Sequence, residues 1–306
     1  MTPVVASLAL RSLLHGPELP VTVVASFAHA AYLRVDTGAP ATDPPTLVTL
    51  VTRDGVDHPN ALTLPEPADR RPLAAVHRGH TGTVGVGRLL VAGRSYRPVR
   101  WRCPVPSLPP VDAAVLAAAV GRAGEHLAAR TGPLPVQLGA PLRTVAEAVA
   151  CDDLQAARTG ADRLIGLGPG LTPAGDDLLA GLVAGVRVLT PAVVTAVTPP
   201  VTGVRETAEA LGAYTVRRAV GRTTDVSVAL LCHAANGAVA TPAARLLAAL
   251  TRADGPVQRR IADATDDLLA VGSTSGRDLA TGLLTAGEVV GRVSRVTAGP
   301  PAATAA

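Results

Sequence analysis

The segment 166–177 reads GLGPGLTPAGDD and joins a glycine-rich loop to two adjacent carboxylates. Gly166, Gly168 and Gly170 can adopt backbone angles that are closed to other residues, so this loop can approach a ligand closely. Thr172 followed by proline is typical of a helix N-cap and first turn, which predicts a helix starting at that proline. The free N–H groups of such a helix start would attract an anion.

Asp176 and Asp177 fall in the first turn of this predicted helix, where carboxylates stabilise a helix through its dipole. Because they follow a loop with three glycines, these two carboxylates also suggest a ligand-binding or metal-binding role. They would either hold a hard cation such as Mg²⁺, which could bridge a phosphate, or bind amide N–H groups. Asp177, Gly181 and Gly185 share one stripe of the helix, which predicts that Asp177 is turned toward a second helix packed against it.

A second motif, VGSTSGRD at 271–278, resembles another helix start, with Ser275 and Asp278 spaced as a capping box. Capping alone would explain this spacing. The motif nevertheless crowds three hydroxyls between two glycines, and Arg277 adds a fork suited to a carboxylate or phosphate. We therefore predict that it forms the wall opposite the glycine-rich loop.

Two weaker patterns accompany these motifs. The sequence GRTTDVS at 221–227 is a hydroxyl-rich helix start in which Thr224 or Asp225 would serve as N-cap. The second pattern is a spacing of five residues that occurs twice along the chain. The first copy is Gly175, Asp177, Leu178, Gly181 and Leu182, and the second is Gly276, Asp278, Leu279, Gly282 and Leu283. This recurrence is either chance or a sign of two similar helix starts that face one shared site.

The sequence thus predicts three groups of site residues. The predicted catalytic residues are Asp176, Asp177 and Asp278. The predicted ligand-binding residues are Gly166, Gly168, Gly170, Thr172, Gly175, Thr224, Ser227, Ser273, Thr274, Ser275, Gly276 and Arg277. The candidate metal ligands are Asp176 and Asp177, with Mg²⁺ as the candidate cofactor.

Composition excludes several other chemistries. The 28 basic residues are all Arg, so Schiff-base catalysis, PLP attachment and a Walker phosphate lysine are excluded. The net charge is +4, but basic residues occur at most in pairs and aromatics make up only 2%, so a nucleic-acid partner is not expected. A small anionic substrate held by Arg, backbone N–H groups, hydroxyls or a metal is the expectation.

The elements that position these motifs fall into two parts. Residues 1–105 contain period-2 apolar stretches separated by turns, which predicts a mostly β domain. PVPSLPP at 104–110 is typical of a stiff linker, and residues 111–300 carry long Ala- and Leu-rich helical stretches, one of them spanning 141–158. The predicted fold class is α+β, with a β domain before a larger helical domain and a frayed tail at 298–306.

Cellular context follows from smaller signals. Three widely spaced cysteines show no CxxC pattern, and the N-terminal stretch is a poor signal peptide because Arg11 interrupts it. No uncharged span has membrane-like apolarity. We expect a cytoplasmic protein with no membrane partner.

GLGPGLTPAGDD and VGSTSGRD, with GRTTDVSVALLCHAANG between them, resemble the bacterial family typified by the AllH-type subunit of oxamate carbamoyltransferase. The resemblance covers most of the helical half, and the β half only loosely. It implies a role in allantoin catabolism, in which an enzyme of several subunits converts oxalurate and phosphate to oxamate and carbamoyl phosphate. It also implies that other subunits are partners of this chain.

Two alternatives to such a subunit stay open from the sequence. One is a stand-alone Mg²⁺-dependent hydrolase, whose aspartates would hold metal ions that activate water. The other is a non-catalytic anion-binding protein, because glycine loops at helix starts bind anions without transforming them.

Overall fold

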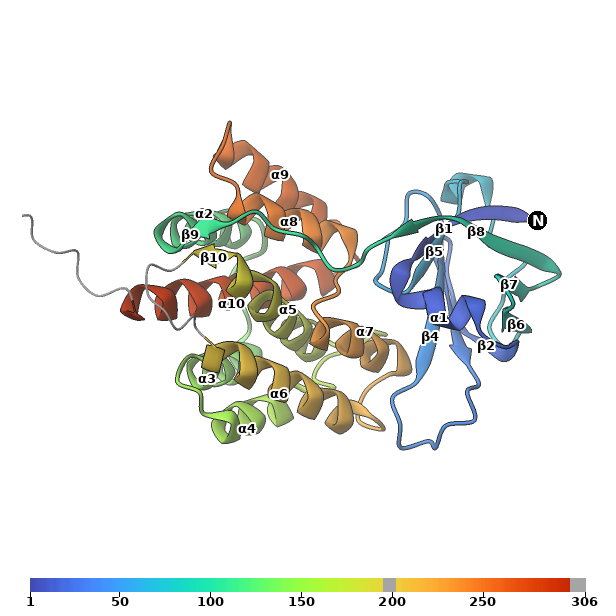
Figure 1. The fold of residues 1–306 in the computed structure, drawn as a ribbon, viewed down its shortest axis with the longest axis horizontal. Coiled ribbons are helices and arrows are strands. Elements are labelled where there is room, and N and C mark those ends of the chain that lie inside the picture. Colours follow the sequence, from blue (N-terminus) through green and yellow to red (C-terminus); the bar gives the residue numbers. More distant parts are fainter. Residues whose placement is uncertain (195–201, 298–306) are drawn as a thin grey trace, which may run out of the picture.

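The structure, a computed structural model, describes residues 1–194 and 202–297. Figure 1 shows a strand-rich lobe beside a helical lobe, and this arrangement confirms the predicted α+β fold class. The predicted frayed tail, together with residues 298–300 of the predicted helical domain, lies outside the described residues.

The strands of the first lobe form a closed barrel in the order β1-β5-β4-β3-β2-β6-β7-β8. Their bounds are β1 Thr2–Ser7, β2 Leu19–Ser26, β3 Ala30–Val35, β4 Thr46–Val51, β5 Ala61–Thr63, β6 Thr81–Gly85, β7 Arg88–Val91 and β8 Arg94–Arg102, with a short helix α1 at Arg11–His15. β1 pairs parallel with β8 and antiparallel with β5, and these pairings complete the closed circuit.

β4 explains how the barrel contacts the helices. Successive side chains of a strand point to opposite faces. Val48 and Leu50 pack in the barrel core, whereas Leu47 packs against Val226 and Ala229 of α7 (Asp225–Ala235). β4 is therefore apolar on both faces, and an apolar cluster joins the two lobes.

After β8, the chain reaches the second lobe through an extended segment, 103–110, that contains neither helix nor strand. The short strands β9 (Val111–Asp112) and β10 (Val193–Val194) pair in parallel. The remaining helices are α2 Ala113–Thr131, α3 Val136–Ala150, α4 Leu154–Leu164, α5 Ala174–Leu189, α6 Thr202–Ala219, α8 Thr241–Thr251, α9 Val257–Leu269 and α10 Ser275–Thr297.

The helix predicted over 141–158 is wrong as a single element. The chain breaks between α3 and α4, where Asp152 has a φ of 58° and Asp153 caps α4 by accepting a hydrogen bond from Ala156 N at 2.9 Å. An aspartate pair suits such a break, because Asp tolerates the left-handed region and is a strong N-cap.

α5 and α10 pack closely through glycine, as the stripe of Gly181 and Gly185 predicts. A side chain on Gly181 would collide with the Leu279 carbonyl, and one on Gly282 would collide with the Leu178 carbonyl. The recurrent set of residues at a constant offset therefore marks two helices whose starts lie together. Figure 1 shows the pair crossing the helical lobe.

Candidate functional site

A cavity of about 70 Å³ lies where the barrel meets the starts of α5 and α10. Its wall is mostly apolar and includes Leu230 of α7 and Leu268 of α9. The polar side chains on its wall are Thr172, Asp177 and Ser275 from the helical lobe and His58 from the barrel. Apolar enclosure with a few convergent polar groups is the usual form of a small-molecule site.

Thr172 and Ser275 join the two motifs directly, since their hydroxyl oxygens lie 2.8 Å apart. Both residues depart from their predicted capping roles. α5 starts at Ala174 with Pro173 at the N-cap and no side-chain cap, so Thr172 is not the N-cap. Ser275 is already the first residue of α10, one position too late to cap it. Both hydroxyls lie at the cavity instead.

Asp177 is buried, with 8% of its surface exposed, and no described residue hydrogen bonds to its Oδ2. Burial raises the pKa of this carboxyl to about 8. The hydroxyls of Ser275 and Thr172 act to lower that pKa, while the charges of Asp278 and Asp176 act to raise it further. Asp177 is therefore mostly protonated near neutral pH and can donate a hydrogen bond as well as accept one.

Asp278 is fully buried and is paired with its neighbour Arg277, whose Nη2 lies 2.7 Å from Oδ1. Burial raises the pKa of Asp278, and the Arg277 guanidinium opposes that rise. The Arg277 guanidinium, which was predicted to bind an anionic ligand, thus binds the carboxylate of Asp278 in this structure.

Asp176 points away from the cavity and is held by protein donors. Its Oδ1 accepts from Gly166 N at 2.9 Å, and its Oδ2 accepts from Ser227 Oγ at 2.7 Å and from the Thr223 hydroxyl. It is 1% exposed. The Asp176 carboxylate therefore links the glycine-rich loop to the start of α7, whereas Asp177 lies on the cavity wall.

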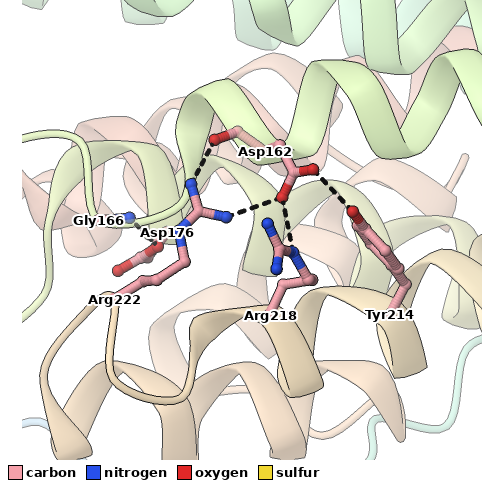
Figure 2. Close-up of polar contacts among 6 residues, drawn as sticks. All are labelled: Asp162, Gly166, Asp176, Tyr214, Arg218 and Arg222. Carbon is pink, nitrogen blue, oxygen red and sulfur yellow. Dashed lines mark hydrogen bonds and ion pairs between the residues drawn. The ribbon is translucent and has the colours of Figure 1, made fainter.

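An ion-pair cluster supports the same loop from the outside (Figure 2). Asp162 of α4 accepts hydrogen bonds from Tyr214 at 2.7 Å, Arg218 at 3.1 Å and Arg222 at 2.7 Å. Arg222 also donates to the Asp162 carbonyl. Its own carbonyl lies so close to Gly166, where φ is 75°, that only glycine fits. The loop therefore leaves α4 in a fixed direction.

Thr224 is the N-cap of α7, as predicted, and accepts a hydrogen bond from Ser227 N at 3.0 Å. Its hydroxyl also donates to the Leu171 carbonyl. With the Ser227 hydroxyl bound to Asp176, the structure places both residues in the support of the loop rather than on the cavity wall.

The other predicted ligand-binding residues fall into two groups. Gly168, Gly170, Ser273 and Thr274 are exposed. Gly175 and Gly276 are buried, each against a carbonyl of the preceding helix, Leu164 and Leu268 respectively. A larger residue would collide there, so close packing accounts for both of these glycines.

Sequence reasoning missed the barrel's contribution, His58 and Tyr32. The Tyr32 hydroxyl lies 3.3 Å from His58 Nε2, and burial raises the pKa of Tyr32 to about 12, with the Asp177 charge as a second cause. Burial lowers the pKa of His58 to about 4; the Asp57 charge opposes this, while Arg102 and His233 reinforce it. The local signal was a histidine between two turns, at 53–55 and 59–60.

Within residues 1–194 and 202–297, no group of three or more His, Cys, Asp or Glu side chains is arranged to hold a metal ion. The predicted metal pair, Asp176 and Asp177, is moreover split between loop support and cavity wall. The described helices also include none long and apolar enough to cross a membrane.

The protein thus consists of a closed β-barrel joined to a helical lobe, and the buried carboxyl of Asp177 lies on a cavity where the two meet. Residues 164–287 match the model of the family described as oxamate carbamoyltransferase subunit AllH. The matched segment contains both motifs and the helix start between them, so the resemblance predicted from these motifs is confirmed. Comparisons with curated proteins and with solved structures found no match.

Proposed function

We propose that this chain is a subunit of an oxamate carbamoyltransferase-type complex that converts oxalurate and phosphate to oxamate and carbamoyl phosphate in allantoin catabolism. The observation that carries the proposal is the meeting of Thr172, Asp177 and Ser275 on one cavity wall, because all three belong to the segment that matches the family. The two helix starts that resemble the family thus form one candidate site.

The reaction has simple requirements. A phosphate oxygen forms a bond to the carbamoyl carbon, the bond from that carbon to the oxamate nitrogen breaks, and the proton of the hydrogen phosphate passes to that nitrogen. Positioned hydrogen-bond donors for the carbonyl oxygen and a group that handles the proton suffice, without a covalent nucleophile. Hydroxyls at Thr172 and Ser275 fit the first requirement, and a carboxyl poised near neutral pH at Asp177 fits the second.

Binding of a ligand's amide N–H groups fits Asp177 better than binding of a metal ion, because Asp177 belongs to no group of three or more potential metal ligands among the described residues. We assign Arg277 and Asp278 to supporting the part of the cavity wall that carries Asp177. We assign the exposed residues Gly168, Gly170, Ser273 and Thr274 to the outer rim of the site, where the anionic end of a ligand or another subunit would contact them.

The experiment is reconstitution. The chain should be co-expressed with the products of neighbouring genes, purified as a complex, and assayed for carbamoyl phosphate formed from oxalurate and phosphate. We expect turnover by the complex and loss of turnover with Asp177→Asn. Turnover by the isolated chain, or no partner among the neighbouring products, would contradict the subunit proposal.

A further inference from the structure

The cavity combines polar groups that are unusual for an anion site. Among the described residues, its wall carries two hydroxyls, one carboxyl and one imidazole, and includes no arginine. Two guanidiniums bound beside lining residues are engaged elsewhere: Arg277 pairs with Asp278, and Arg102 pairs with Asp57 and donates to the His58 carbonyl at 2.8 Å. A carboxylate in this cavity would therefore bury its own negative charge without a cation to balance it.

The two sides of the cavity are fixed relative to one another. Asp57, next to His58 in the barrel, accepts a hydrogen bond from the Thr241 hydroxyl of α8 at 3.0 Å. The Thr241 N–H donates to the Asp57 carbonyl at 3.1 Å. Because Tyr32 also holds the His58 ring, the imidazole is positioned before any ligand binds.

An amide group complements these side chains on both sides. Its N–H groups can donate to the unpartnered Oδ2 of Asp177, and its carbonyl can accept from a hydroxyl or from an imidazole N–H. Burying an unsatisfied polar atom is costly, so a ligand that supplies a donor to Oδ2 is favoured over one that cannot.

We propose that this cavity binds an uncharged carboxamide or ureido group between Asp177 and His58, and that it discriminates against a carboxylate in the same place. The inference rests on the proposed function, whose substrate carries such a carbamoyl end. It assigns His58, from outside the segment that matches the family, to ligand binding, and Tyr32 to positioning His58. The anionic end of the ligand then lies toward the cavity mouth.

Three small probes of nearly equal size test this selectivity by calorimetry on the full chain: oxamide with two amides, oxamate with one, and oxalate with none. We expect oxamide and oxamate to bind and oxalate to bind at least about tenfold more weakly, the factor that one lost buried hydrogen bond with an unpaired partner produces. Equal binding of oxalate and oxamide, or no binding of oxamide, would overturn the proposal.

Variants locate the effect. Asp177→Asn replaces a carboxyl that can ionise by a permanently neutral amide that always offers N–H donors, so the oxamide preference over oxalate should shrink or invert. His58→Gln should weaken oxamide and oxamate together. His80→Gln, in an exposed turn, is the matched control and should change nothing. If Asp177→Asn folds poorly, Ser275→Ala serves as the second variant and should lower oxamide affinity. An unchanged probe ranking in folded Asp177→Asn contradicts the proposal.

The outcomes separate this inference from the proposed function. Oxamide selectivity that depends on Asp177 and His58, without conversion of oxalurate by the reconstituted complex, would sustain the amide site and reject the reaction. Conversion of oxalurate with unaltered probe ranking in both variants would sustain the reaction and reject the amide site.

Discussion

The Thr172 and Ser275 hydroxyls lie 2.8 Å apart, although 103 positions separate these residues in the chain. This contact joins the end of the glycine-rich loop to the first residue of α10 beside the cavity. Thr172→Val keeps the shape and removes the hydroxyl. We expect oxamate affinity to fall by a factor of about 2 to 10, the value of one hydrogen bond, with little change in melting temperature.

Calorimetry and thermal melting on the same samples check this expectation. Thr159→Val is the control, because the Thr159 hydroxyl donates only to a carbonyl of its own exposed helix turn. A large loss of stability in Thr172→Val with unchanged affinity would make the contact purely structural.

Asp176 and Asp177 should respond oppositely to replacement by asparagine. Asp176→Asn removes an acceptor of three hydrogen bonds, so we expect the free energy of unfolding to fall by about 2 kcal/mol or more. Asp177→Asn should cause no loss of stability and should abolish turnover by the complex. Denaturant unfolding and the oxalurate assay, run on both variants, test the division; comparable stability losses would refute it.

Where α5 and α10 cross, the positions of Gly181 and Gly282 should tolerate no residue larger than glycine. Gly181→Ala or Gly282→Ala overpacks backbone against backbone, and we expect a loss of about 1–3 kcal/mol in the free energy of unfolding. Gly121→Ala is the matched control in α2, where no described atom lies within 4 Å of the added carbon, so it should be neutral or stabilising. Urea unfolding measures all three, and a neutral Gly282→Ala would disprove the close approach.

Stability should depend on pH through Asp177. The folded protein raises the pKa of this carboxyl from 3.8 to about 8, so its favourable contribution is complete below the lower value and is lost as pH rises toward the higher one. Asp177→Asn removes this dependence and should therefore gain stability relative to the wild type between about pH 5 and 8. His58 acts in the opposite sense, because its contribution is lost as pH falls from 6.5 through about 4.

Denaturant unfolding over this pH range, with wild type and Asp177→Asn measured in parallel, gives the difference directly. A constant difference across the range would show that Asp177 titrates as an ordinary carboxyl.

Local patterns predicted the Thr224 cap and the glycine stripe of α5, which act over one or two turns, but the caps expected at Thr172 and Ser275 were wrong. They could not separate Asp176 from Asp177. Which of two adjacent carboxylates faces the cavity depends on Ser227 and Thr223, which lie about fifty residues further along the chain. His58 was missed for the same reason, because its role arises only when the barrel docks on α7 and α8.

The reciprocal contacts between α5 and α10, in which Gly181 faces Leu279 and Gly282 faces Leu178, are those of a two-fold axis running between the helices. A carbamoyl compound has no such symmetry, so a symmetric pair of helix starts would offer it two equivalent carboxyls. The equivalence is broken one residue earlier, where Asp176 on one helix corresponds to Arg277 on the other. Arg277 pairs with Asp278 on its own helix, and of the two carboxyls it is Asp177 that lies on the described cavity wall. A pair of helices with local two-fold symmetry thus carries a single, directional site.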